Sequence, residues 1–176
     1  IRKELQEELQ IPIQGWFSNE HQFAMGPFYE NAKGIRGFQI ASPSIIGIRG
    51  VEVAFEMIEE AGIKQIQAKA AKGTDLMIEL FDAWLAPLGF TLGTPREASR
   101  RGGHIIVIHK DAKQIAVALR KLKNVIPDYR EPGAIRLAIS PLATSYVEVY
   151  DGFERLRDLV ASGDCKKVQL DGNRVT

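Results

Sequence analysis

The sequence has little cysteine, almost no net charge, no long apolar run and no signal peptide. Its 176 residues contain one cysteine, Cys165, which excludes an internal disulfide and a cysteine-built zinc site and favours a reducing, cytoplasmic compartment. Positive and negative side chains nearly balance, with 23 Lys and Arg against 22 Asp and Glu, so nucleic acid and anionic membranes are not expected partners. No apolar run approaches the roughly 20 residues that span a bilayer. The N-terminus has neither a signal peptide nor an initiator Met, so we expect the natural chain to begin elsewhere.

Common catalytic and metal-binding motifs are absent as well. The sequence has no Gly-rich phosphate loop followed by Lys and Ser or Thr, no HExxH, no CxxC and no GxSxG. His104 and His109 stand five positions apart at the ends of one expected strand and therefore project to opposite faces. We expect no metal site.

An irregular, aromatic-rich segment occupies residues 1–43. The spacing of Leu5 and Leu9 favours a short helix near residues 4–10, ended by Pro12. After it, Gly and Pro alternate with six Trp, Phe and Tyr residues. A disordered linker would be poor in aromatic side chains, so this segment is expected to be an ordered functional or interface loop.

Regular elements are predicted in residues 44–176, and we place a domain boundary at 43/44. Apolar residues recur every three or four positions in two stretches, which predicts helices over about 44–61 and 63–85. Ser42 or Ser44 is the expected N-cap of the first. Shorter elements follow: strands at 90–92, 104–109, 125–126 and 135–139, helices at 111–122 and 144–160, and an Asp171-Gly172 turn. Strands separated by helices indicate an α/β (α+β) fold with a small sheet packed with helices.

Arg136 is one of two candidate sites, because it interrupts the apolar strand 134–139. A guanidinium in such a strand must snorkel, pair with a carboxylate or face a cleft. Arg is also the side chain best shaped to bind a carboxylate through two parallel hydrogen bonds. The residues alone leave a structural ion pair and a substrate clamp equally open.

The second candidate combines residues 15–19 with Ser42-Pro43. The Trp16 indole N–H and a Ser42 hydroxyl near a helix N-terminus are both able to donate to a phosphate. The alternative is structural, with Trp16 as an aromatic anchor and Ser42 as a helix cap. Arg100-Arg101 beside two glycines is a weaker anion-binding candidate, for which a charged turn is the favoured interpretation.

A series of motifs in order and register resembles the C-terminal part of kynureninases. The motifs are Gly15-Trp16-Phe17, Phe23-Ala24-Met25, Gly34-Ile35 with Phe38, Ser42-Pro43, Arg101-Gly102-Gly103-His104, Asp128-Tyr129-Arg130 and Ile135-Arg136-Leu137 with Pro141-Leu142. The resemblance implies the small C-terminal domain of a homodimeric, fold-type-I enzyme that uses pyridoxal 5′-phosphate (PLP). Such enzymes cleave L-kynurenine or 3-hydroxykynurenine to L-alanine and an anthranilate.

The resemblance also implies residue roles. Trp16 and Ser42 would contact the cofactor phosphate, Arg136 would bind the substrate α-carboxylate without a structural ion pair, and Phe17 and Asn19 would lie near the substrate. The family's PLP-bearing lysine lies upstream of the Trp motif, so no catalytic residue is assigned, and the chain alone is expected to be inactive. Residues 1–43 would then contain a remnant of the large domain.

The sequence departs from the family pattern at three matched positions. Asn19 replaces a usual His, Gly26 a usual Asp, and Ala143 a common aromatic residue. Two alternatives therefore stay open. One is another aminotransferase, desulfurase or lyase of the same fold, and the other is a stand-alone, non-catalytic interaction domain.

Overall fold

The structure, a computed structural model, describes residues 1–170 and divides into two compact units. The first is Ile1–Glu56 and the second begins at Met57. The boundary lies inside helix α1 (Ile45–Ala61). The predicted Asp171-Gly172 turn lies outside the described residues.

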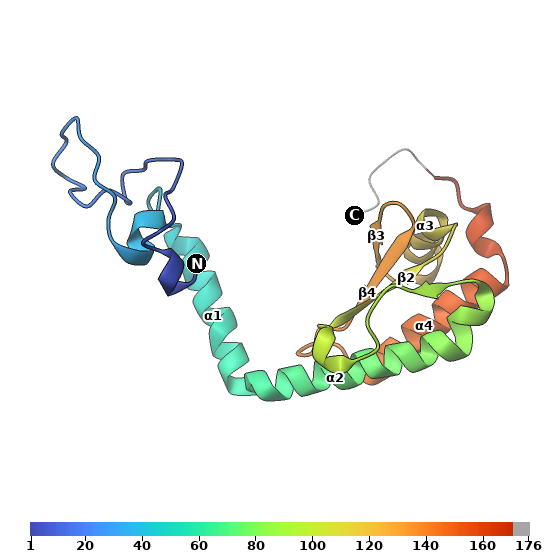
Figure 1. The fold of residues 1–176 in the computed structure, drawn as a ribbon. Helices are drawn as coiled ribbons and strands as arrows, with labels where there is room; N and C mark the ends of the chain where they lie inside the picture. Colours follow the sequence, from blue (N-terminus) through green and yellow to red (C-terminus); the bar gives the residue numbers. More distant parts are fainter. Residues whose placement is uncertain (171–176) are drawn as a thin grey trace. The chain divides into compact units, whose positions relative to one another are not determined.

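The second unit contains most of the regular structure (Figure 1). Helix α2 (Ile63–Leu80) continues through a π-helical turn, Phe81–Leu85, and a short 3-10 turn, Ala86–Leu88. The remaining elements are β1 (Thr91–Leu92), β2 (His104–Ile108), α3 (Ala112–Lys123), β3 (Asp128–Arg130), β4 (Ala134–Ala138) and α4 (Tyr146–Ala161). The structure confirms, to within a few residues, the helices predicted over 44–61, 63–85, 111–122 and 144–160 and the strands predicted at 90–92, 104–109 and 135–139.

The four strands form an antiparallel sheet in the order β1-β2-β4-β3. Side chains alternate between its two faces. Ile105, Val107 and Ile135 are fully buried and pack with residues of α2, α3 and α4. Helices α2 and α4 run side by side (Figure 1). The opposite face of the sheet, which carries Ile106 and Arg136, is only partly buried.

Capping residues define where the helices start and stop. Ser145 and Glu148 form a capping box at the start of α4, with the Glu148 N–H donating to Ser145 Oγ at 3.2 Å. Asn124 ends α3 in the left-handed conformation, with φ at 52°. Ser44, not Ser42, caps α1, because its Oγ accepts from the Gly47 N–H at 3.3 Å.

Two predicted elements are wrong. Residues 4–10 form only a 3-10 turn over Lys3–Leu5, none of whose residues is buried, and an isolated helix this short is unstable in water. Val125-Ile126 is not a strand, because the Val125 N–H donates back to the Leu119 carbonyl at 3.2 Å and completes the cap of α3. The strand begins after Pro127 instead.

The apolar residues of α1 are exposed in the described part of the chain. No residue of α1 is buried, and Ile45, Ile46 and Phe55 are among those with more than half of their surface exposed. No helix within residues 1–170 combines the length and the apolar character that crossing a membrane requires.

Candidate functional site

Arg136 lies at the centre of the partly buried face of the sheet. In β4 it alternates with Ile135 and Leu137, which point into the core, so its side chain emerges on the other face. On that face Ile106 of β2 lies opposite it on one side and Asp128 of β3 on the other. The Arg136 side chain is 40% exposed, which leaves it open to a ligand from solvent.

Asp128 pairs with Arg136 across the two strands. Arg136 Nη2 lies 2.5 Å from Asp128 Oδ2, and the same oxygen accepts from Arg130 Nε at 3.0 Å and Nη2 at 2.8 Å. Partial burial raises the pKa of Asp128, but the hydrogen bonds and charges of Arg130 and Arg136 outweigh it and hold that pKa below its usual range. The expectation that Arg136 has no structural ion pair is therefore wrong, because the β3–β4 register places a carboxylate opposite it.

A pocket of about 250 Å³ adjoins this pair. Its walls are mostly apolar and include Leu119, Leu137 and Phe153. Its charged part consists of Asp128, Arg136 and Glu148. An apolar concavity with a few convergent polar groups is the usual form of a small-molecule site. The second unit therefore offers an arginine beside such a concavity, and the contacts of Arg136 within residues 1–170 leave some of its N–H donors unused.

Trp16 and Phe17 lie in the first unit, in the loop before Ser18. The Trp16 ring is half exposed and makes edge-on contacts with Phe17 and Phe23, at centroid distances of 5.6 and 5.8 Å. Its indole N–H donates to the Gln22 carbonyl at 2.7 Å. Phe17 is half buried, and its N–H donates to the Ile40 carbonyl at 3.4 Å.

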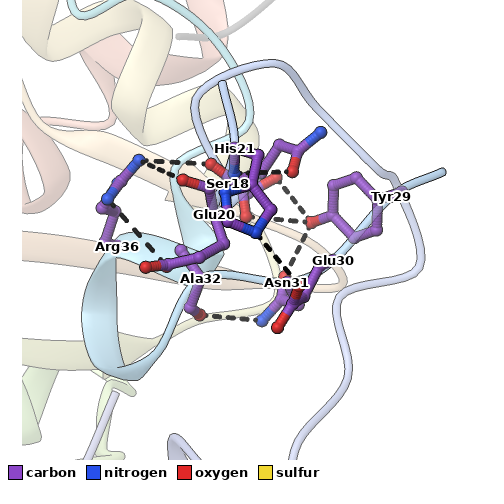
Figure 2. A network of polar contacts seen from close by, with 9 residues as sticks. Ser18, Glu20, His21, Tyr29, Glu30, Asn31, Ala32 and Arg36 are labelled. Atoms are coloured by element: carbon purple, nitrogen blue, oxygen red, sulfur yellow. Dashed lines mark hydrogen bonds and ion pairs between the residues drawn. The ribbon is translucent and has the colours of Figure 1, made fainter. Parts of the chain in front are cut away.

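Ser18 holds this loop through a network of polar contacts (Figure 2). Its side chain is fully buried, and its Oγ donates to the Gly15 carbonyl and accepts from the Gly15 N–H, at 3.0 and 3.1 Å. The Tyr29 hydroxyl lies 2.9 Å from Ser18 Oγ and 2.7 Å from Asn31 Oδ1. Sequence reasoning did not single out Ser18 or Tyr29, and a buried serine two positions after Trp16 has no distinguishing spacing.

Asn19 belongs to the same loop, and both its side-chain oxygen and its backbone carbonyl accept hydrogen bonds. Its Oδ1 accepts from the His21 N–H at 3.0 Å, and its carbonyl accepts from Arg36 Nη2 at 3.2 Å. Asn19 also forms an isolated antiparallel bridge with Asn31. Within residues 1–170 the Asn19 amide nitrogen donates no hydrogen bond, so both of its N–H donors are available to a ligand.

Ser42 is exposed and lies three residues before α1 begins. Because Ser44 performs the capping, the Ser42 hydroxyl makes no hydrogen bond within residues 1–170. The structure thus brings Trp16, Phe17 and Asn19 into one loop and places Ser42 in the same unit, whereas Arg136 belongs to the second unit.

Arg101, the weaker anion-binding candidate, makes structural contacts with its guanidinium. Its side chain is only 1% exposed, with Nε donating to Thr74 Oγ1 at 3.0 Å and Nη2 paired with Asp75. Its Nη1 donates to the Arg96 carbonyl. The structure supports the favoured interpretation of this region as a structural turn.

Comparisons with known proteins identify the family of this chain. The kynureninase C-terminal domain family matches residues 66–156, more than half of the chain. A kynureninase of Pseudomonas fluorescens is 34% identical over 149 residues, which cover 85% of this chain and 36% of that protein. A kynureninase of Shouchella clausii is 36% identical over 157 residues, 88% of this chain and 36% of that protein. The chain thus spans little more than a third of the length of these relatives.

The structural comparison identifies the fold. An apo structure of a cysteine desulfurase from Thermococcus onnurineus NA1 superposes with a TM-score of 0.73 at 19% identity, covering 92% of this chain and 42% of that chain. The predicted fold class, a small C-terminal α/β (α+β) domain with a small sheet packed with helices, is confirmed. The chain belongs to the kynureninase C-terminal domain family.

Proposed function

We propose that this chain is the C-terminal part of a PLP-dependent kynureninase. That enzyme would hydrolyse L-kynurenine or 3-hydroxykynurenine to L-alanine and an anthranilate. The observation that carries the proposal is the match to kynureninases at 34–36% identity over most of the chain. In this assignment residues 44–176 are the small domain, and residues 1–43 contain a remnant of the large domain with the cofactor and interface loop.

Arg136 is proposed to bind the α-carboxylate of the amino-acid substrate. Its position on the partly buried sheet face supports this role, because a guanidinium with unused N–H groups offers a carboxylate two parallel charge-assisted hydrogen bonds. Fixing the carboxylate in this way would hold the substrate in one orientation, which lowers the entropic part of the barrier.

Trp16 and Ser42 are proposed to contact the phosphate of PLP. The Ser42 hydroxyl lies just before the first turn of α1 and makes no hydrogen bond within residues 1–170, so it is suited to bind an anion. Trp16 must exchange its Gln22 carbonyl for a phosphate oxygen. A hydrogen bond to a charged acceptor contributes about 1.5–3 kcal/mol, against about 1 kcal/mol for a neutral pair, so the exchange is favourable. When bound, PLP supplies the electron sink for negative charge at the substrate Cα.

Phe17 and Asn19 are proposed to contact the aromatic end of the substrate. The half-buried Phe17 ring offers an apolar surface, and the Asn19 amide has donors suited to a carbonyl or ring substituent. We further propose that the whole enzyme is a cytoplasmic homodimer. The exposed aromatic side chains Phe23 and Phe28, at 75% and 88% exposure, support a contact of this loop with another surface.

The test is an activity measurement on the longer protein that contains this chain. The protein is incubated with L-kynurenine, 3-hydroxykynurenine and L-cysteine in parallel, with and without added PLP, and anthranilate is followed by its fluorescence. We expect PLP-dependent anthranilate release from L-kynurenine and none from the 176-residue chain alone, which has no assigned PLP lysine. Sulfide release from L-cysteine without anthranilate from L-kynurenine would instead identify a desulfurase of the same fold.

A further inference from the structure

We propose that Asp128 is a positioning residue for the substrate carboxylate site: it orients the Arg136 guanidinium and is not displaced by the substrate. This inference rests on the proposed role of Arg136 in carboxylate binding. The resemblance to kynureninases implies no role for Asp128. The role proposed here follows from the β3–β4 register, which pairs Asp128 with Arg136.

The strand register places Asp128 beside Arg136. Asp128 and Arg136 are partners across β3 and β4, so their side chains leave the sheet on the same face. The contact joins one terminal nitrogen, Arg136 Nη2, to Asp128 Oδ2. A guanidinium has five N–H donors, so this contact leaves the other groups of Arg136 available for a bidentate partner.

Asp128 is itself fixed by a second arginine. Arg130 Nε and Nη2 both donate to Asp128 Oδ2, at 3.0 and 2.8 Å. The Asp128 side chain is only 26% exposed, compared with 57% for Arg130. A carboxylate held by two arginines cannot move away from Arg136 without losing hydrogen bonds to Arg130 as well. It therefore acts as a fixed support for the Arg136 guanidinium.

The charge of the cluster also favours an added carboxylate. Two arginines, Arg130 and Arg136, share the single negative charge of Asp128, which leaves one net positive charge on these three sheet side chains. The nearby carboxylate of Glu148, on α4, lines the same pocket and accepts hydrogen bonds from Ser145. A substrate carboxylate would neutralise the net positive charge of the three sheet side chains. A competing internal carboxylate would instead have to leave Arg136 when the substrate arrived.

The experiment compares Asp128→Asn with wild type in the longer protein that contains this chain. Asparagine keeps the size and an acceptor oxygen but removes the charge. We expect KM for L-kynurenine to rise about tenfold while kcat changes less than twofold, since the lost interaction contributes to binding in both ground and transition states. Asp82→Asn is the matched control, because Asp82 forms a two-bond pair with Arg96, at 2.7 and 2.8 Å, in the π-helical turn instead of the sheet.

A second measurement does not depend on turnover. Phenylglyoxal modifies free guanidinium groups, and the modification rate at Arg136 is read by peptide mass spectrometry. We expect Asp128→Asn to accelerate labelling of Arg136 several-fold and Asp82→Asn to leave it unchanged. Arg130→Gln, which removes only the exposed support of Asp128, should give a smaller acceleration and covers the case in which Asp128→Asn does not fold.

The outcomes separate the possible roles of Asp128. A fall in KM for Asp128→Asn would overturn the proposal and make Asp128 a competitor of the substrate. An unchanged KM and labelling rate, with only a lower melting temperature, would also overturn it and leave a purely structural pair. If wild type releases no anthranilate, the proposed function fails, and the labelling rates of Arg136 still decide whether Asp128 positions that guanidinium.

Discussion

Arg101 and Thr74 form a buried hydrogen bond between the loop before β2 and helix α2. Arg101 Nε donates to Thr74 Oγ1 at 3.0 Å, the Arg101 side chain is 1% exposed and Thr74 is fully buried. Thr74 Oγ1 also lies within hydrogen-bond distance of the Ala70 and Ala71 carbonyls. The loop that leads into the Arg136-bearing sheet is therefore anchored on α2 through the Thr74 hydroxyl and through the ion pair of Arg101 with Asp75.

Replacing Thr74 with valine should destabilise the second unit. Valine keeps the shape but leaves the buried Nε–H of Arg101 without an acceptor, which costs about 2 kcal/mol in free energy of unfolding. Urea unfolding followed by circular dichroism measures the loss. Thr74→Ser, which keeps the hydroxyl, is the control and should lose clearly less. Equal stability of Thr74→Val and wild type would show that the hydrogen bond is not formed.

Gly15 should not tolerate alanine, because a Cβ there would overlap the carbonyl oxygen of Ile40. The clash forces a backbone shift that costs about 1–3 kcal/mol, and it displaces the loop that carries Trp16. Gly26→Ala is the matched control, since a Cβ at Gly26 meets no atom within 4 Å. Hydrogen exchange of residues 15–20, measured by mass spectrometry, should accelerate only in Gly15→Ala. Similar exchange in both variants would contradict the close approach of Gly15 and Ile40.

Ser42 and Ser44 should have separable roles although they lie two residues apart. Ser44→Ala removes the N-cap of α1 and should cost about 1 kcal/mol of helix stability. Ser42→Ala should leave stability unchanged, because the Ser42 hydroxyl has no partner within the described residues. In the proposed longer, PLP-dependent enzyme, Ser42→Ala should instead lower PLP affinity several-fold, measured by cofactor release on dialysis. Unchanged PLP affinity in Ser42→Ala would count against the proposed phosphate contact.

Much of the fold could be predicted because local patterns agree with the final packing. Helix α4 has both an apolar stripe and the Ser145–Glu148 capping signal, and β2 is a run of β-branched residues. The strand at 125–126 could not be rejected in the same way. No strand forms there because Asn124 adopts a left-handed conformation and the Val125 N–H bonds to the end of α3. The hydrophobicity of residues 125–126 does not encode this cap.

The candidate site was less predictable because it depends on strand pairing. The sequence identifies Arg136 as an anomaly within an apolar strand, but the Asp128 partner follows from the β3–β4 register. That register is set by tertiary packing and the connecting turn, not by either strand alone. Similarly, the Gln22 carbonyl that accepts from Trp16 is a backbone group, so no residue type marks it.

Stability should decrease in acid partly through Glu148. Hydrogen bonds from the backbone N–H and the hydroxyl of Ser145, at 2.7 and 2.8 Å, hold the pKa of Glu148 below its ordinary value of 4.5. A pKa depressed in the folded state means that the unfolded chain binds the proton more tightly. The stabilisation is therefore complete above about pH 4.5 and is lost as the pH falls through the lower, folded-state pKa.

Glu148→Gln isolates this contribution, because other carboxylates, including Asp128 and Asp164, also have lowered pKa values and add to the acid sensitivity. The difference in urea midpoint between wild type and Glu148→Gln should be largest at pH 7 and should shrink as the pH falls from 4.5 to 3. Ser145→Ala should show the same convergence, since it removes the hydroxyl that bonds the Glu148 carboxylate. A difference that stays constant over this pH range would mean that Glu148 stabilises α4 without its charge, through packing or helix propensity alone.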